Sequence, residues 1–195
     1  MPAIVNHDEM RNKILDCFES LAYNTPISNI SLRMVAKEMG TSHARLQYYF
    51  SGTDDMLCAF AQRVSDSYKE LLISITQKCI SGKFKTKEDF ISLYVDEVFS
   101  SSYDEKYKKI FYQLYGLSYF NESIREILSK SIGLYYEQVK EMLRNIYHTD
   151  LDDAALTMVS VHDGIGLYSD YLKIETYEIV QAFMKIDIPN HIKTT

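Results

Sequence analysis

The sequence predicts an all-α protein of about nine helices, and three observations support this prediction. Apolar residues recur at helical spacing along most of the 195-residue chain, and no segment shows the sustained alternation of a half-buried strand. No proline stands between Pro26 and Pro189, so nothing in that stretch forces a helix to stop. Short glycine or polar segments interrupt the apolar pattern where helices would end.

Capping residues and glycines mark the helix ends. In the N-terminal part, the expected helices cover about residues 7–23, 32–40, 43–50 and 53–82. In the remainder, they cover about residues 86–100, 104–119, 122–148, 151–172 and 175–185. Asn121 and Asp150 are the expected N-caps of the seventh and eighth helices. The residues from Pro189 onward are expected to be a loose tail.

The composition is that of a globular protein, with 46% apolar and 25% charged residues. The N-terminus lacks the basic and apolar regions of a signal peptide, and no apolar run is long enough for a membrane span. We therefore expect a cytoplasmic protein without a membrane partner. Cys17, Cys58 and Cys79 are scattered without metal-site spacing, so we expect reduced thiols, no metal and no cofactor.

The segment from Ser31 to Phe50 has the pattern of a helix-turn-helix, in which two short helices are joined at Gly40. The apolar positions expected to face inward are Val35, Ala36, Met39, Leu46 and Phe50. The side chains left on the outer face of the second helix are then His43, Ala44, Gln47 and Tyr48, with Arg33 and Arg45 at its flanks.

Charge also distinguishes this segment from the rest of the chain. The protein carries a net charge of −6, so it has no general attraction for nucleic acid. Within Ser31–Phe50, however, there are three basic residues, Arg33, Lys37 and Arg45, and only one acidic residue, Glu38. So few contacts in each subunit favour a dimer, which doubles them.

This part of the chain, about 50 residues long, resembles the DNA-binding part of the TetR family of bacterial regulators. The matching residues are Ser31, Val35, Ala36, Gly40, Ser42, Leu46, Tyr49, Phe50 and Leu57. The resemblance implies a DNA-binding domain over residues 1–52 and a helical ligand-binding and dimerisation domain over residues 53–195. The implied function is that of a ligand-responsive regulator, most commonly a repressor, which a small-molecule effector releases from DNA.

The resemblance also implies which residues meet operator DNA. Base contacts would come from Arg33, His43, Ala44 and Gln47, and phosphate contacts from Arg45, Tyr48, Tyr49 and Thr53. Two positions depart from the family pattern. Gln47 replaces the usual tyrosine and can read adenine through two hydrogen bonds. Thr53 replaces a lysine that often holds a phosphate, which puts the strength of that contact in doubt.

Two further sets of residues are expected in the C-terminal part. The effector pocket is expected among the aromatic residues Tyr94, Phe111, Tyr112, Tyr115, Tyr119, Tyr135, Tyr136 and Tyr168, although such residues can equally be plain core. The homodimer interface is expected to be a four-helix bundle, formed by the eighth and ninth helices of both subunits. The residues expected there are Ala155, Met158, Val159, His162, Ile165, Gly166, Val180, Phe183 and Met184.

Two other kinds of protein remain as alternatives. An enzyme is disfavoured because the chain has no phosphate loop, nucleophile motif or paired carboxylates outside helix caps. His162 and Asp163 invite a catalytic or metal role, but adjacent positions on a helix diverge, and a packed or interface histidine is the simpler interpretation. A helical adaptor that binds only protein is the second alternative, against which the polarity of the second short helix argues.

Overall fold

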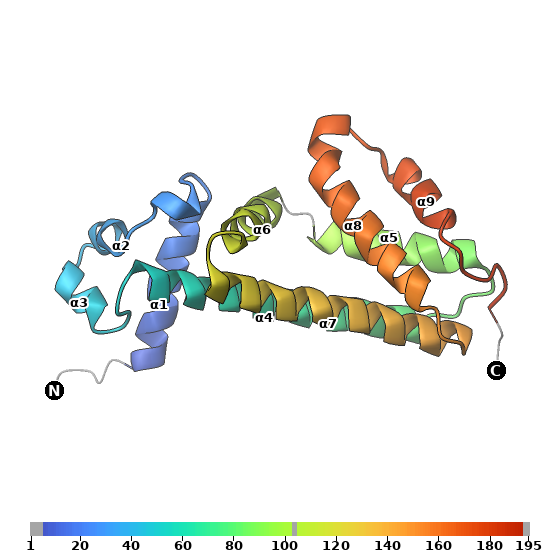
Figure 1. Cartoon of the computed structure of the whole chain (residues 1–195), viewed down its shortest axis with the longest axis horizontal. Coiled ribbons are helices and arrows are strands. Elements are labelled where there is room, and N and C mark those ends of the chain that lie inside the picture. The colour runs from blue at the N-terminus through green and yellow to red at the C-terminus, as the bar shows by residue number, and fades with distance from the viewer. Residues whose placement is uncertain (1–5, 103–104, 193–195) are drawn as a thin grey trace. The chain divides into compact units, whose positions relative to one another are not determined.

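The computed structural model describes residues 6–102 and 105–192. Over these residues the chain forms nine α-helices and one short 3-10 helix, which confirms the all-α prediction (Figure 1). The helices are α1 (His7–Ala22), the 3-10 helix η1 (Ile27–Asn29), α2 (Leu32–Glu38), α3 (His43–Gln47), α4 (Thr53–Ser81), α5 (Lys87–Ser102), α6 (Glu105–Ser118), α7 (Glu122–Tyr147), α8 (Asp152–Leu172) and α9 (Thr176–Met184).

Side-chain caps begin several helices where the sequence predicts them. The hydroxyls of Ser31 and Ser42 accept hydrogen bonds from the amides of Met34 and Arg45, at 3.3 and 3.2 Å. The Asn121 carboxamide oxygen accepts from the Ile124 amide at 3.1 Å. Each cap satisfies an amide that the first helical turn leaves without a partner.

Three local features differ from the sequence expectations. The third helix ends at Gln47, and residues 48–50 form a turn rather than a further helical turn. Asp150 does not cap α8, because its carboxylate accepts a hydrogen bond from the Arg144 guanidinium at 2.7 Å. The 3-10 helix η1 fills the connection between α1 and α2, where no helix was expected.

The expectation of a loose tail from Pro189 is wrong up to residue 192. Thr86 and His191 form an isolated antiparallel bridge, and the Lys87 amide donates to the Asn190 carbonyl at 3.0 Å. The buried Lys87 ammonium donates to the Ile186 carbonyl, and burial lowers the pKa of this lysine. Local sequence patterns do not indicate that residues 190–192 pair with a segment about 100 residues earlier in the chain. Residues 193–195 lie outside the described part.

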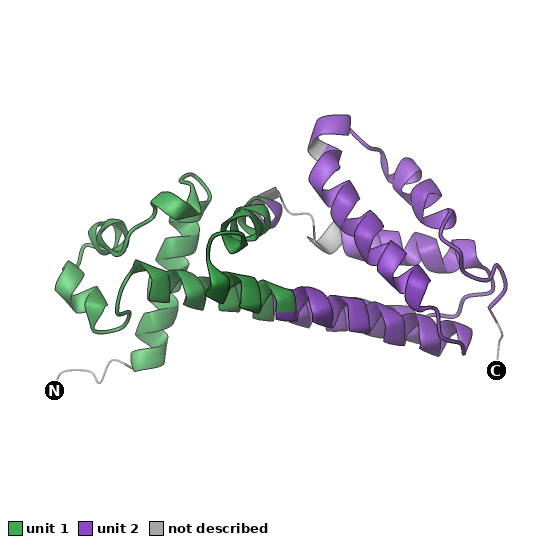
Figure 2. Cartoon of the chain, viewed as in Figure 1, with its two compact units in different colours: residues 1–66, 109–129 green, residues 67–108, 130–195 purple. Residues whose placement is uncertain are grey.

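The chain divides into two compact units, which Figure 2 colours separately. Unit 1 comprises residues 1–66 and 109–129, and unit 2 comprises residues 67–108 and 130–195. Helices α4, α6 and α7 each contribute residues to both units. The predicted functional boundary at residue 52 remains a prediction, because compactness of packing does not test it.

Unit 1 has a core that joins the first three helices to later parts of the chain. Phe18, Phe50 and Phe60 are fully buried, and the rings of Phe18 and Phe60 lie 4.7 Å apart. Leu114 of α6 and Leu128 of α7 belong to the same cluster. The helix-turn-helix segment therefore shares its core with parts of α4, α6 and α7.

Unit 2 has its own core, in which tyrosines are prominent. Tyr94 of α5 and Tyr135 of α7 are buried, and their hydroxyl oxygens share a hydrogen bond of 2.7 Å. Burial raises the pKa of both phenols, so this pair stays neutral over the physiological range. The ring of Tyr94 also packs on Phe183 of α9, with centroids 5.5 Å apart.

Removing one member of this hydroxyl pair should destabilise unit 2. We expect Tyr94→Phe to lower the free energy of unfolding by about 1–2 kcal/mol, because the Tyr135 hydroxyl would lose its hydrogen bond inside the core. The double variant Tyr94→Phe/Tyr135→Phe should cost less than the sum of the two single changes. Urea unfolding of all four proteins measures this coupling, and strictly additive costs would contradict it.

No helix among the residues described, 6–102 and 105–192, has both the length and the apolar character needed to cross a membrane.

Candidate DNA-binding site

The helix-turn-helix segment has the buried side that the sequence predicts. Val35, Ala36, Leu46 and Phe50 are buried, and Met39 is half-buried. Helix α2 packs against both α1 and α3. These contacts confirm the inward-facing positions and fix which side of α3 is left outside.

The turn between the two short helices depends on Gly40. This residue has a φ of +62°, a left-handed conformation that residues with a Cβ atom adopt only at an energetic cost. The Thr41 amide then donates to the Ala36 carbonyl at 2.9 Å, which closes the end of α2. Ser42 caps α3 directly afterwards, so the turn and the cap together set where the second helix begins.

The side chains predicted to meet DNA lie together on and beside α3. Ala44, Arg45, Gln47 and Tyr48 are exposed, and 75% of the Tyr48 surface is accessible. Arg33 is exposed on α2, and the half-buried residues of the set are His43, Tyr49 and Thr53. The outer face of α3 thus presents polar groups while its inner face is held by Leu46.

Thr53 has a structural role that the sequence did not indicate. Its hydroxyl oxygen accepts a hydrogen bond from the Leu32 amide at 3.3 Å, which joins the start of α4 to the start of α2. The hydroxyl hydrogen remains a donor for a second acceptor. Thr53 therefore keeps the capacity for the predicted phosphate contact, in a position fixed by α2.

Two residues of α1, His7 and Arg11, lie near this site and were not predicted from the sequence. The His7 ring lies 5.8 Å from the Tyr48 ring and 5.1 Å from the Tyr49 ring, between centroids. The Arg11 guanidinium donates to the Tyr49 carbonyl and lies 4.0 Å from the centroid of the Phe50 ring. The i, i+4 spacing puts His7 and Arg11 on one face of α1, but no sequence signal indicates what that face meets.

Known structures share this arrangement over nearly the whole chain. A Mesorhizobium loti protein assigned to the TetR family of transcriptional regulators matches with a TM-score of 0.77 and 9% identity, covering 92% of this chain and 93% of that one. A Saccharomonospora viridis protein described as a transcriptional regulator, in complex with choline, matches with a TM-score of 0.73 and 17% identity, over 96% and 100% of the two chains. The multidrug binding protein EbrR, complexed with imidazole, matches with a TM-score of 0.69 and 20% identity, covering 94% of this chain and 93% of that one.

This chain has the fold of TetR-family regulators. The resemblance inferred from the helix-turn-helix residues is thereby confirmed at the level of fold. No family model matches the sequence, and no curated protein matches it. At identities of 9%, 17% and 20%, the likeness shows the fold alone.

The residues predicted for an effector pocket are divided between the two units. Tyr94, Tyr135, Tyr136 and Tyr168 belong to unit 2, and Phe111, Tyr112, Tyr115 and Tyr119 belong to unit 1. Their environments differ as well: two are buried and hydrogen-bonded to each other, three are half-buried, and Tyr115, Tyr119 and Tyr168 are exposed. The predicted pocket therefore stays a prediction for each residue separately.

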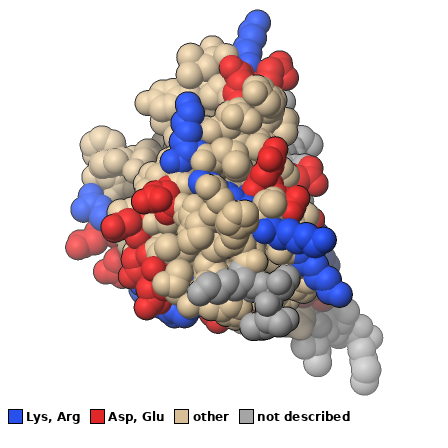
Figure 3. Space-filling model, turned by 90° about the vertical axis from the view of Figure 1, so that its right-hand side faces the viewer, with Lys and Arg blue, Asp and Glu red and all other residues tan. Residues whose placement is uncertain are grey.

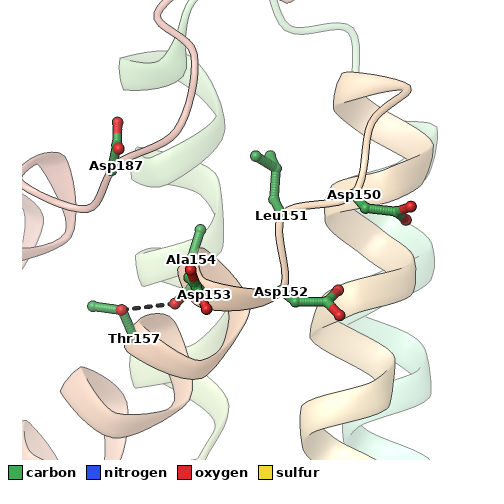
Figure 4. Close-up of a pocket in the computed structure, with 7 residues that line it drawn as sticks. All are labelled: Asp150, Leu151, Asp152, Asp153, Ala154, Thr157 and Asp187. Carbon is green, nitrogen blue, oxygen red and sulfur yellow. Dashed lines mark hydrogen bonds between the residues drawn. The ribbon is translucent and has the colours of Figure 1, made fainter.

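A surface pocket of about 490 Å³ lies elsewhere in unit 2. Its lining comes from the start of α8 and the segment after α9, namely Asp150, Leu151, Asp152, Asp153, Ala154, Thr157 and Asp187 (Figure 4). Asp150 pairs with Arg144 and Asp152 with Lys140, at 2.7 and 3.2 Å. These pairs balance part of the negative charge at the pocket. Among the described residues, no group of three histidine, cysteine or carboxylate side chains is placed to hold a metal ion.

The residues predicted for the dimer interface mostly lie in the protomer's own core. Seven of the nine are buried there, namely Ala155, Met158, Val159, His162, Ile165, Gly166 and Phe183, while Val180 and Met184 are half-buried. The apolar face of α8 that the sequence shows most clearly thus packs on the core of unit 2. The dimer interface as a whole stays a prediction.

The opposite face of α8 is unusually apolar for an exposed surface. Leu156, Leu167 and Tyr171 recur at helical spacing and are 56%, 43% and 80% exposed. Gly164 lies on the same side, and a Cβ added there would meet nothing within 4 Å. Small and apolar residues in one row allow a second helix to approach closely.

Proposed function

We propose that this protein is a DNA-binding transcriptional regulator that acts as a homodimer on a palindromic operator. The observation that supports it best is the outer face of α3, where exposed polar side chains stand on a helix held by a buried core. A short helix presented in this way fits the major groove and meets base edges there. The shared fold with known regulators supports the same conclusion.

Gln47 and Arg33 are the residues that we propose read the operator. A glutamine side chain can bond both N6 and N7 of adenine, whereas an arginine pairs with O6 and N7 of guanine. Both residues are exposed. Phosphate contacts from Arg45, Tyr48, Tyr49 and Thr53 would orient the helix without adding sequence preference.

The net charge of −6 gives the chain little general affinity for DNA. On the face drawn in Figure 3, acidic and basic side chains are interspersed among neutral ones, in keeping with a net charge of −6. Binding then depends on a small set of contacts in each subunit. Two subunits double that set and match the two halves of a palindrome.

The dimer that we propose forms through the exposed row of α8, extended by Tyr177 of α9, which is also exposed. Apolar side chains left in water favour association, because a partner removes them from solvent. We name Leu156, Leu167 and Tyr171 in place of the buried residues expected from sequence.

We propose repression with release by a small-molecule effector as the mode of regulation. One of the similar structures is in complex with choline and another with imidazole, so this fold holds small molecules in those proteins. An effector that binds one conformation better would shift the population away from the DNA-binding state.

Selection of bound sequences from random duplex DNA tests the proposal directly. The full-length protein should enrich a palindrome, because a two-fold dimer presents two copies of α3. We expect Gln47→Ala and Arg33→Ala each to weaken operator binding by about 1–3 kcal/mol and to relax the preference at one base pair of each half-site.

A matched control is Lys130→Ala, an exposed cation in unit 2. Its loss should leave the selected sequence unchanged. If the wild-type chain enriches no sequence even at low salt, the helix-turn-helix is scaffold, and the alternative of a helical adaptor that binds only protein replaces the proposal.

A further inference from the structure

Helix α3 is too short to hold its own position. It has five residues, fewer than an isolated helix needs to be stable in water, so its orientation must come from contacts outside it. Ser42 fixes its first turn, and Leu46 and Phe50 anchor its inner side. The far end, at Tyr48 and Tyr49, is where polar contacts with α1 occur.

Arg11 makes two different contacts at that far end. Its guanidinium donates a charge-assisted hydrogen bond to the Tyr49 carbonyl, and its Cζ atom lies over the buried Phe50 ring, 4.0 Å from the ring centroid. Such bonds are stronger than neutral ones, and a cation over the face of an aromatic ring is attracted to that ring. Together they fix both the direction and the distance between α1 and the end of α3.

His7 supports the same junction one helical turn earlier. Its ring packs on Tyr48 and Tyr49, whose own rings lie 5.1 Å apart at an angle of 89°. Tyr48 is a predicted phosphate contact and is otherwise exposed. The first two turns of α1 thus hold both the backbone and the aromatic side chains that follow the recognition helix.

We propose that Arg11 is a positioning residue for operator recognition, which orients α3 by holding the chain at its end from α1. This inference rests on the proposed function. Arg11 contributes through the backbone of Tyr49 and the ring of Phe50. A base contact needs a side chain placed to within a fraction of an ångström, so a loosened α3 loses sequence recognition before it loses general attraction to DNA.

The test compares Arg11→Met and Arg11→Lys with the wild-type protein on the selected operator and on random duplex DNA, over a series of salt concentrations. Methionine keeps an apolar side chain over Phe50 but has no hydrogen-bond donor. Lysine keeps the positive charge and one donor group but lacks the planar guanidinium with its several N–H donors. Lys13→Met is the matched control, because Lys13 is an exposed cation of the same helix paired with Glu9 at 2.6 Å.

We expect Arg11→Met to bind the operator about tenfold more weakly and Arg11→Lys to recover part of that loss. Affinity for random DNA and the slope of log affinity against log salt should stay unchanged. Amide hydrogen exchange in α3 and the following turn should become faster in Arg11→Met, whether or not DNA is present. Lys13→Met should behave as wild type in all these measurements.

Three results would overturn the inference. Unchanged operator affinity would show that α3 needs no help from Arg11. A salt slope reduced by about one per subunit, with equal losses on operator and random DNA, would make Arg11 a direct phosphate ligand. A wild-type protein that selects no DNA sequence at all would overturn the proposed function, and this inference with it. If Arg11→Met does not fold, Arg11→Lys alone decides between these outcomes.

Discussion

The variant Leu167→Glu is expected to convert the dimer to a monomer and to lower operator affinity by about a hundredfold or more. Leu167 lies in the middle of the exposed apolar row of α8, between Leu156 and Tyr171. In a two-fold interface both subunits carry the substitution, so two carboxylates would be buried without partners. Sedimentation velocity at micromolar concentration measures the mass, and titration with operator DNA measures the affinity.

The control for this variant is Ile80→Glu. Ile80 is also an apolar residue of unit 2, 40% exposed, but it lies on α4. The same chemical change at that position should leave a dimer that binds the operator normally. A Leu167→Glu protein that remains dimeric would show that two copies meet through a different surface.

Phe50→Ala is expected to lower the free energy of unfolding by about 3–5 kcal/mol and to abolish operator binding. Phe50 is fully buried between α3 and α1, and the Arg11 guanidinium lies over its ring. Its truncation removes apolar burial, leaves a cavity and takes away the surface on which Arg11 rests. Chemical unfolding followed by circular dichroism measures the loss of stability.

Phe120→Ala provides the matched comparison. Phe120 stands in the turn between α6 and α7 with 92% of its surface exposed, so the same substitution removes almost no buried contact. Its effect should stay within about 0.5 kcal/mol. Equal losses for the two variants would mean that Phe50 does not anchor the end of the recognition helix.

The sequence predicted most of the helix-turn-helix correctly because the relevant signals are local. Glycine at position 40 permits the left-handed turn, and serines at positions 31 and 42 cap the helices that follow them. Period and capping depend on neighbours a few residues away, which a single sequence displays directly. The exposed positions of α3 followed from the buried ones.

The face of α8 that we propose for association could not be predicted in the same way. Helical spacing in the sequence identified one apolar face, with Met158 and Ile165, and only the structure revealed the exposed row with Leu156 and Leu167. Periodicity shows that residues share a face but not what covers it. The structure shows that the first face packs in the protomer's own core and that the second is exposed.

The sequence by itself determined the helical class, the order of the helices, and the caps and the turn of the helix-turn-helix segment. Only the tertiary structure showed that α6 and parts of α4 and α7 complete the core of unit 1, that residues up to 192 pair with residues 85–87, and that Arg11 holds the end of α3. The physical reason is sequence separation. Capping and periodicity act within one or two helical turns, whereas these contacts join residues far apart in the sequence, 38 positions in the case of Arg11 and Tyr49, and form only when the chain packs.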